Sequence, residues 1–547
     1  MSPSYSGMAA VCALLLAIPR PNASPRSESA PGVVIIATTG DISTPIPTVD
    51  DNATNYEIVN LLFLRLAELG PDLSTVGDRG FRPMLARRWQ RRDSVTLVFE
   101  LDPRARWHDG VPVTSQDVVF TYERALESSA FVRALRRIES VKAEGPGRVA
   151  IRFVSSYGEQ LYDATYHLLI LPAHLLRTIP RDSLATSAFA RNPVGNGAFR
   201  WVRRVPGQLV ELAAYDRFFL GKPQMLRVIF RVTGDPEARL NLLLTGEADV
   251  AQSLALPAEA RVRQEAALRV VPVVGPGVTY ALFNQRARGD RSKPHPILSD
   301  VNVRRALLIA LDRESMTKAV YGGHARVPDG PVPQTFAWVE VPGHRFPAPD
   351  TARARALLAS AGWKDSNGDG TLDKDGMPLE LTVQAPNRTP QRPMLAQQMQ
   401  ARFRQLGVKL NVDLLDGPVW IERRNKGEFD IDMSFAQLDP TPSGWSWSWS
   451  CEGAGQAGRN VGSHCNPRID SMLDQASKER NPLPQYREIL KLIRQDVPAL
   501  FLSAPATVVA VSRRYRDSPF RAESLWLSLR EWSVAPGKQL PRDRAAE

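Results

Sequence analysis

Strand-like and helix-like segments alternate along the whole chain, and this alternation restricts the fold more than any other feature. The β-branched run Val95–Leu101 predicts a strand. A helix is predicted after Thr114, a natural N-cap, because Asp117 follows three residues later as a short-acid variant of the capping box. Helix Pro236–Leu244 is predicted to end near Gly246, a residue that suits a helix C-terminus. The alternation favours α/β lobes with mostly open sheets.

The chain is too long for one compact core. Its 547 residues predict three or four domains at about 150 residues each. No repeat of fixed period and no long linker separates the predicted elements, so the lobes are expected to consist of interleaved chain segments. The other predicted elements are strands at 32–39, 199–214, 408–414 and 429–435, and helices at 303–311, 351–361 and 396–406.

The composition is that of a folded protein and argues against nucleic-acid binding. Hydrophobic residues make up 43% of the chain, and 69 basic against 58 acidic side chains give a net charge of +11. The basic residues are scattered, whereas nucleic-acid binders gather them in runs with interleaved aromatic residues. We therefore expect no nucleic-acid partner.

The N-terminus has the pattern of a secretory signal peptide. The apolar stretch Met8–Pro19 is shorter than the roughly 20 residues that span a bilayer, and a segment rich in Ser, Pro and Arg follows it. Cleavage is expected near Ala23 or Ala30. Plain export is preferred to lipidation at Cys12, because Val11 stands where a lipoprotein has a small residue.

Two cysteines remain after this leader, Cys451 and Cys465, in a segment rich in Gly, Ser and Asn. In an exported protein such a pair predicts one disulfide that closes a loop. Zinc binding is the weaker interpretation. His464 stands beside Cys465, but there is no CxxC and no second His at ligand spacing.

The sequence lacks the motifs of the common enzyme classes, so no catalytic residue, metal or cofactor is predicted. It has no HExxH, no P-loop, no GxSxG and no GxGxxG, and none of its 7 histidines forms a helical i, i+4 pair. A Ser/His/Asp triad stays open, because its members need not be close in sequence.

Three further motifs allow two interpretations each. Asp365–Gly376 spaces its oxygen ligands as in a calcium loop, but Gly376 stands where a bidentate Glu is required, so a Gly/Asp turn is the alternative. The tryptophans of Trp445–Trp449 have period two, which on a strand places them on one face, in a core or along a ligand pocket. Asp439 either pairs with an ammonium group or caps an Asp-Pro turn.

An ordered set of motifs resembles the solute-binding proteins of ABC importers, in the family that binds dipeptides, oligopeptides and nickel (solute-binding protein family 5). The resemblance extends over about residues 33–535. Each motif is weak alone, but their order and spacing are specific. The motifs are Pro83–Trp89, Trp107–Gly110 with Asp117–Phe120, Pro193–Phe199, Leu243–Val250, Phe283-Asn284, Val303–Arg313 and Phe429–Ile431.

This resemblance implies an α/β fold of the two-lobed periplasmic-binding-protein type (type II, cluster C), with an extra domain inserted in the first lobe. Such a molecule closes over its ligand like a hinged trap and catalyses no reaction. The implied boundaries are 1–31 for the signal peptide and flexible leader, 32–62, 190–278 and 505–547 for lobe I, 63–189 for the inserted domain, and 279–504 for lobe II.

The resemblance also implies ligand-binding residues. In peptide binders of this family, an Asp ten residues after the Phe-Asp start of a strand neutralises the ligand's α-amino group, and Asp439 stands at that position. The peptide backbone pairs with strand edges, which correspond to Gly40–Ile42 and Phe435–Gln437. Dipeptide binders also carry a disulfide in this region, which Cys451 and Cys465 match.

The sequence departs from the family pattern around the pocket. Phe435-Ala436 stands where Gly-Trp is usual, and Gly417 stands where an aromatic residue is expected, with Trp420 nearby. Dipeptide binders hold the C-terminal carboxylate with an Arg after a strand, and the nearest candidate is Arg388. Trp445 is the candidate for an aromatic pocket wall, and the shifted tryptophans could stack on a sugar ring.

Together these features predict an extracytoplasmic receptor that captures di- to oligopeptides between two lobes and delivers them to the permease subunits of an ABC transporter. The expected molecule is a monomer in the periplasm or at the cell surface. The alternatives are a receptor for a nickel chelate, an oligosaccharide or an opine and, less favoured, an exported hydrolase.

Overall fold

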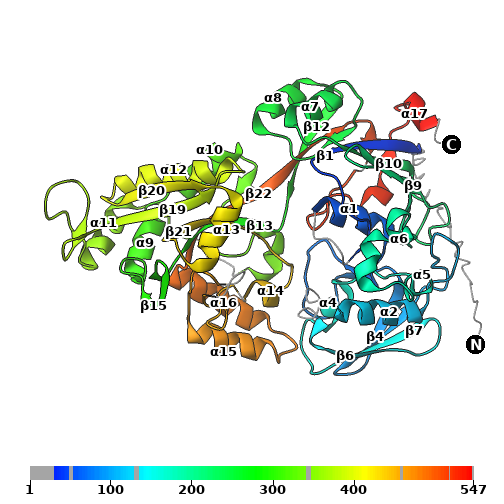
Figure 1. Cartoon of the computed structure of the whole chain (residues 1–547), viewed down its shortest axis with the longest axis horizontal. Coiled ribbons are helices and arrows are strands. Elements are labelled where there is room, and N and C mark those ends of the chain that lie inside the picture. The colour runs from blue at the N-terminus through cyan, green and yellow to red at the C-terminus, as the bar shows by residue number, and fades with distance from the viewer. Residues whose placement is uncertain are drawn as a thin grey trace, which may run out of the picture.

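One 12-stranded mixed sheet runs through both lobes of the computed structural model (Figure 1). The structure describes residues 30–47, 53–127, 135–340, 346–446, 448–455, 460–516 and 518–544. The predicted signal segment Met8–Pro19, with Cys12 and Ala23, lies outside these residues. Within the described ranges, no helix is both long and apolar enough to cross a bilayer.

Two crossings connect the lobes. The long strand β22 (Ala499–Ser512) pairs through its first residues with β13 (Gly277–Phe283) of the second lobe. Through its last residues it pairs with β12 (Leu268–Val274) and β11 (Val250–Ala251) of the first lobe. The other crossing is the chain itself, since only Gly275-Pro276 separates β12 from β13. Figure 1 shows these strands bridging the two lobes.

The first lobe contains the β1 end of the large sheet. β1 is a continuous apolar run that is buried along almost its whole length, as expected for a parallel strand covered on both faces. It lies between β10 and β11 and is parallel to both. The elements of this part are β1 (Gly32–Thr38), α1 (Ala53–Leu62), β8 (Phe199–Val205), β9 (Leu209–Ala214), β10 (Met225–Val232), α7 (Pro236–Leu244), α8 (Leu256–Gln264), β23 (Tyr515–Arg516), β24 (Ser533–Val534) and α17 (Pro541–Arg544).

A separate antiparallel sheet, in the order β4-β5-β7-β6, lies between α1 and β8 in the sequence. Helix α2 packs on it and begins with the predicted capping box: Thr114 N–H donates to Asp117 Oδ2 at 2.8 Å. The elements of this region are β2 (Ala67–Leu69), β3 (Phe81–Pro83), β4 (Ala86–Asp93), β5 (Thr96–Leu101), α2 (Ser115–Leu126), β6 (Ile138–Ala143), β7 (Arg148–Phe153), α4 (Gln160–Thr165), α5 (Ala173–Leu176) and α6 (Ala188–Arg191).

The second lobe contains the other end of the large sheet, in the order β20-β19-β21-β13, with its own apolar core. Its strands are β13, β14 (Arg286–Ala287), β15 (Asp290–Pro294), β16 (Ala325–Arg326), β17 (Asp373–Lys374), β18 (Met377–Pro378), β19 (Glu380–Pro386), β20 (Lys409–Leu415) and β21 (Ile431–Gln437). Its helices are α9 (Val301–Ile309), α10 (Arg313–Tyr321), α11 (Thr351–Ser360), α12 (Gln391–Arg404), α13 (Gly417–Lys426), α14 (Pro442–Ser446), α15 (Pro467–Ala476) and α16 (Leu483–Asp496).

The C-terminal segment returns to the first lobe and is held there by buried charges. The guanidinium of Arg514 pairs with Asp249 and with Asp543, each at 2.8 Å. Asp249 also accepts the Ile35 N–H at 2.9 Å, and Asp543 accepts the Val33 N–H at 2.7 Å. Because both carboxylates bind β1 as well as Arg514, they join the two ends of the described chain.

The predicted α/β alternation is confirmed, and most predicted elements agree with the structure to within a few residues. Helix α7 has the predicted bounds. The segment 199–214 is a hairpin of β8 and β9 rather than one strand. Trp445 and Ser446 belong to helix α14 (Pro442–Ser446), so the strand that would have placed the tryptophans of Trp445–Trp449 on one face is not formed there. Period two alone did not fix the conformation here, since Pro442 opens the helix at its first position, where proline is well tolerated.

Candidate ligand-binding site

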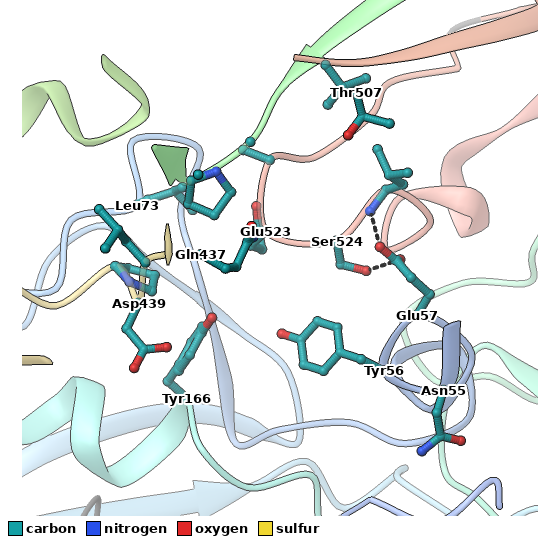
Figure 2. Close-up of a pocket in the computed structure, with 18 of the residues that line it drawn as sticks. Asn55, Tyr56, Glu57, Leu73, Tyr166, Gln437, Asp439, Thr507, Glu523 and Ser524 are labelled. Atoms are coloured by element: carbon teal, nitrogen blue, oxygen red, sulfur yellow. Dashed lines mark hydrogen bonds between the residues drawn. The ribbon is translucent and has the colours of Figure 1, made fainter. Parts of the chain in front are cut away.

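A cavity of about 820 Å³ lies between the two lobes, next to the strands that join them. This volume is within the range of ordinary small-molecule sites. Figure 2 shows that side chains from both lobes face it. Its lining residues come from the segments 55–73, 166–169, 252–253, 273–277, 435–440, 505–507 and 522–525, together with Pro47.

The second lobe contributes the end of β21 to this cavity. Phe435–Gln437 pairs on one side with Gly277–Thr279 of β13. On the other side β19 pairs with β21 only at Ile431 and Asp432. Among the residues that the structure describes, no strand therefore covers the second edge of Phe435–Gln437. Phe435 is 45% exposed and lines the cavity.

Asp439 follows β21 and presents an exposed carboxylate to the cavity. The backbone just before it is fixed, since Leu438 N–H donates to Pro276 O at 2.9 Å. In Figure 2 the carboxylate lies beside Tyr166. Burial raises the pKa of the Tyr166 phenol well above its ordinary value, and Tyr56 and the charge of Asp439 raise it further. No described residue forms an ion pair with Asp439.

Arg65 of the first lobe also lines the cavity and is only 8% exposed. Its Nε donates to Tyr166 O at 2.6 Å and its Nη1 to Asn60 Oδ1 at 2.5 Å, while Nη2 lies 3.4 Å from Tyr56 Oη. The guanidinium carbon lies 5.4 Å from the centroid of the Tyr166 ring and 6.0 Å from that of Tyr56. All of these partners are neutral.

Two of the sequence motifs hold the backbone next to Arg65. His108 accepts the Gly195 N–H at Nδ1 and donates from Nε2 to Gly197 O, both at 3.1 Å. Burial lowers the pKa of His108 to about 4, so the ring is neutral and keeps both hydrogen bonds near pH 7. Gly197 N–H donates to Leu62 O at 2.8 Å, and a Cβ at Gly195 would overlap that oxygen.

Glu57 fixes a further wall of the cavity. Its carboxylate accepts a hydrogen bond from Ser524 Oγ at 2.5 Å (Figure 2). It also accepts hydrogen bonds from the N–H groups of Leu525 and Trp526 at 2.9 and 3.2 Å. Burial raises the pKa of Glu57, although these donors favour the charged form. Both carboxylate oxygens accept hydrogen bonds from this segment, so Glu57 serves to hold residues 524–526 against α1.

The lobes also meet beside the cavity through Glu159, which is 3% exposed. Its carboxylate accepts hydrogen bonds from Thr75 Oγ1 at 2.9 Å, from Tyr486 Oη at 3.0 Å and from the hydroxyl of Thr441. Thr441 and Tyr486 belong to the second lobe, whereas Thr75 belongs to the first. Burial raises the pKa of Glu159. Because Thr441 lies two residues from Asp439, this contact also fixes the segment that carries Asp439.

Gly40 and Ile42 do not line the cavity, contrary to the expectation of a strand edge at Gly40–Ile42. β1 already ends at Thr38. The reason is the Asp41 carboxylate, which pairs with Arg204 Nη2 at 2.7 Å and accepts the Gly207 N–H at 2.8 Å. These contacts hold the segment in an irregular conformation against the β8–β9 hairpin.

Arg388 and Trp420 also lie away from the lining residues. Arg388 is exposed in the turn after β19, where its Cδ packs near Gly417. Trp420 Nε1 donates to Asp432 Oδ1 at 2.6 Å, and Asp432 is completely buried. The indole therefore satisfies a buried carboxylate within the second lobe.

Trp449, the last tryptophan of the run Trp445–Trp449, packs in the core. Trp449 is 4% exposed, and its ring packs edge-on against Phe501 and Tyr280. The side chain of Trp445 and the whole of Trp447 lie outside the described residues. The predicted disulfide is present between Cys451 and Cys465.

The acidic loop forms a turn held by its own side chains. The Asp365 carboxylate accepts the N–H groups of Gly368 at 2.7 Å and Gly370 at 3.0 Å, and Asp369 accepts the Thr371 N–H at 2.7 Å. These are the bonds of an Asx-type turn. In the described part of the chain, no group of three or more His, Cys, Asp or Glu residues is placed to hold a metal ion.

Of the predicted site residues, Asp439, Phe435 and Gln437 line the cavity, whereas the first-lobe wall formed by Tyr56, Arg65 and Tyr166 was not predicted. One feature of the sequence could have pointed to Arg65. Arg65 stands inside the apolar run Leu61–Ala67, where a charged side chain needs a specific partner or a ligand.

Two α/β lobes joined by strand crossings, with a cavity between them, define a two-lobed solute-binding protein. The chain belongs to the bacterial extracellular solute-binding proteins, family 5, whose middle-region model matches residues 80–457. It is 25% identical over 443 residues to the oligopeptide-binding protein AppA of Bacillus subtilis, covering 79% of each chain.

Solved structures share the fold over nearly the whole chain. The structure of Bacillus subtilis AppA in complex with a nonapeptide matches with a TM-score of 0.72 at 23% identity, covering 93% of this chain and 100% of that one. The ABC transporter substrate-binding protein CtaP of Listeria monocytogenes matches with a TM-score of 0.77 at 21% identity, with the same coverage. These structures confirm the predicted two-lobed fold, and the family model over residues 80–457 confirms the predicted family.

Proposed function

We propose that this protein is an extracytoplasmic receptor that captures peptides between its lobes and delivers them to the permease of an ABC transporter. The observation that carries the proposal is the arrangement at the end of β21. An uncovered strand edge, Phe435–Gln437, leads directly to the exposed carboxylate of Asp439 inside the interlobe cavity. The similarity to an oligopeptide-binding protein supports the same conclusion.

A peptide would use both features at once. Its backbone N–H and C=O groups would pair with the edge Phe435–Gln437, an interaction that does not depend on side chains. Its terminal ammonium group would pair with Asp439, which has no cationic partner among the described residues. Backbone pairing would then provide affinity for many sequences, whereas Asp439 would set the direction and register of the bound chain.

Closure of the lobes would bury the peptide and present a joint surface to the permease. We assign lobe I to residues 32–62, 190–278 and 505–547, the inserted domain to 63–189 and lobe II to 279–504. The two crossings formed by β22 and by β12–β13 would serve as the hinge. In this role the protein acts by binding alone, as an exported monomer in the periplasm or at the cell surface.

The proposal is tested by native mass spectrometry of the full exported chain purified from its host, with fragmentation of any ligand released. Tightly bound ligands stabilise the folded protein and often survive purification. A series of peptide masses supports the proposal. Release of a single nickel chelate, oligosaccharide or opine would replace the peptide assignment with the non-peptide alternative.

Asp439→Asn tests the ammonium contact directly. A charge-assisted hydrogen bond contributes about 1.5–3 kcal/mol, so we expect a roughly 10- to 100-fold loss of peptide affinity by calorimetry. The control is Asp413→Asn, since Asp413 is a carboxylate of the same lobe that pairs with Arg423 at 3.2 Å and does not line the cavity. Equal affinities of Asp439→Asn and wild type would exclude Asp439 as the anchor.

A further inference from the structure

The unusual feature of the cavity is a buried cation without a counter-ion. Arg65 is 8% exposed, and its hydrogen-bond partners are a backbone carbonyl, an amide oxygen and a phenol. Buried charges in proteins are normally paired with an opposite charge. The rings of Tyr56 and Tyr166 flank the guanidinium, but aromatic faces offset only part of its desolvation.

Arg65 also keeps hydrogen-bonding capacity for a ligand. A guanidinium has five N–H groups, of which three are used toward Tyr166, Asn60 and Tyr56, so two remain. The contact to Tyr56 is long, at 3.4 Å. A planar fork with two free donors matches a carboxylate, which accepts two parallel hydrogen bonds.

The unpaired anion of the cavity lies close to this cation. Both charges flank one residue: the guanidinium carbon of Arg65 lies 5.4 Å from the centroid of the Tyr166 ring and its Nε donates to Tyr166 O at 2.6 Å, while Asp439 lies on another side of the same tyrosine. Figure 2 shows Asp439 beside Tyr166, with Tyr56 directed toward them. The cavity therefore carries one unpaired charge of each sign on the two sides of one tyrosine.

We propose that Arg65 binds the ligand's carboxylate while Asp439 binds its ammonium group, so that the cavity selects short zwitterionic peptides with both ends free. This inference rests on the proposed peptide-receptor function and adds the second anchor and the ligand length. An extended residue spans at most about 3.6 Å, so two charges that lie on either side of Tyr166 can be bridged by a ligand of only a few residues. Arg388, in its exposed turn, takes no part.

The first test changes the ligand and leaves the protein intact. Full-length protein freed of endogenous ligand is titrated with random tripeptide pools in three forms: both ends free, C-terminal amide and N-terminal acetyl. A fourth pool contains random nonapeptides with free ends. We expect the amide and acetyl pools to bind about 10- to 100-fold more weakly than the free pool, and the nonapeptides to bind at least about 10-fold more weakly.

The second test separates the two anchors. Arg65→Gln should bind free and amidated tripeptides equally but still reject the acetylated pool, whereas Asp439→Asn should accept the acetylated pool and still prefer free carboxylates. The matched control is Arg124→Gln. Arg124 is also largely buried, donates to the carbonyls of Leu176 and Ile179 and stacks on an aromatic ring, but it does not line the cavity.

The outcomes distinguish this inference from the function on which it rests. Equal binding of free and amidated tripeptides by the wild type, or an Arg65→Gln protein that still prefers the free carboxylate, overturns the role of Arg65 and leaves the peptide receptor intact. Equal binding of nonapeptides overturns the length limit. If no pool binds, both the peptide function and the carboxylate anchor are refuted.

Discussion

Glu159→Ala is expected to weaken closure of the lobes and thereby shorten the lifetime of the bound peptide. Glu159 accepts three hydroxyl hydrogen bonds, and two of the donors, Thr441 and Tyr486, belong to the second lobe. Without the carboxylate these two hydroxyls lose their acceptor at a buried interface. The variant therefore acts on the contact between the lobes rather than on the cavity itself.

The size of the effect follows from these contacts. Each hydrogen bond to a charged acceptor contributes about 1.5–3 kcal/mol, but removing a buried carboxylate also relieves its desolvation. We expect a net loss of about 2 kcal/mol from the closed arrangement, which corresponds to a roughly 30-fold faster peptide dissociation. Glu159→Gln keeps the size and one acceptor oxygen, so its effect should be smaller.

Stopped-flow dissociation of a fluorescent peptide measures the effect, and small-angle scattering with and without peptide measures closure. The control is Asp543→Ala, which removes a buried carboxylate from the first lobe, away from the cavity. It should lower the melting temperature without changing the dissociation rate. If Glu159→Ala also lowers only the melting temperature, the contact merely stabilises the fold and the reasoning is refuted.

The same carboxylate predicts a pH dependence. Burial raises the pKa of Glu159 above its ordinary value near 4.5 in the unfolded chain. The folded state therefore holds the proton longer, and stability falls as the pH rises from about 4.5 through the raised pKa. Replacing Glu159 with Gln should remove this part of the pH dependence, measured as the difference in unfolding free energy between the two proteins.

The remaining predictions concern stability. Burial lowers the pKa of His108 to about 4, so when the pH falls from about 6.5 to 4 this histidine is protonated in the unfolded chain before it is protonated in the folded protein. The free energy of unfolding should therefore fall by up to about 3 kcal/mol over this range. Urea titrations should show that His108→Asn abolishes this decrease. Gly195→Ala should destabilise by more than about 2 kcal/mol, because its Cβ would overlap a backbone carbonyl, whereas Gly147→Ala, with open space around it, should not. Reducing the Cys451–Cys465 disulfide should lower the unfolding free energy by about 3 kcal/mol, and an unchanged urea midpoint would contradict this.

Local patterns in the sequence were sufficient to predict most helices and strands and to identify the family. Helix Pro236–Leu244 and the capping box at Thr114 follow from spacing within one or two turns, and they appear as predicted. Some of the ordered motifs that identify the family hold junctions between backbone segments, as Gly195 and His108 do beside Leu62. Such contacts allow few residue types at these positions, so the motifs can be recognised from the sequence without a structure.

Long-range packing decides which side chains line the cavity. Asp439 was predicted from its place after a strand, but Arg65 and Tyr166 are about a hundred residues apart and meet only when the chain between them has folded. The same holds for Glu159, whose partners Thr441 and Tyr486 come from the other lobe. The sequence by itself determined the α/β lobes, because these depend on local periodicity, and its resemblance to a known family predicted Asp439 as a ligand contact. Tertiary structure alone decided that an unpaired Arg65 faces the cavity, because burial and the lack of a counter-ion are properties of the packed molecule.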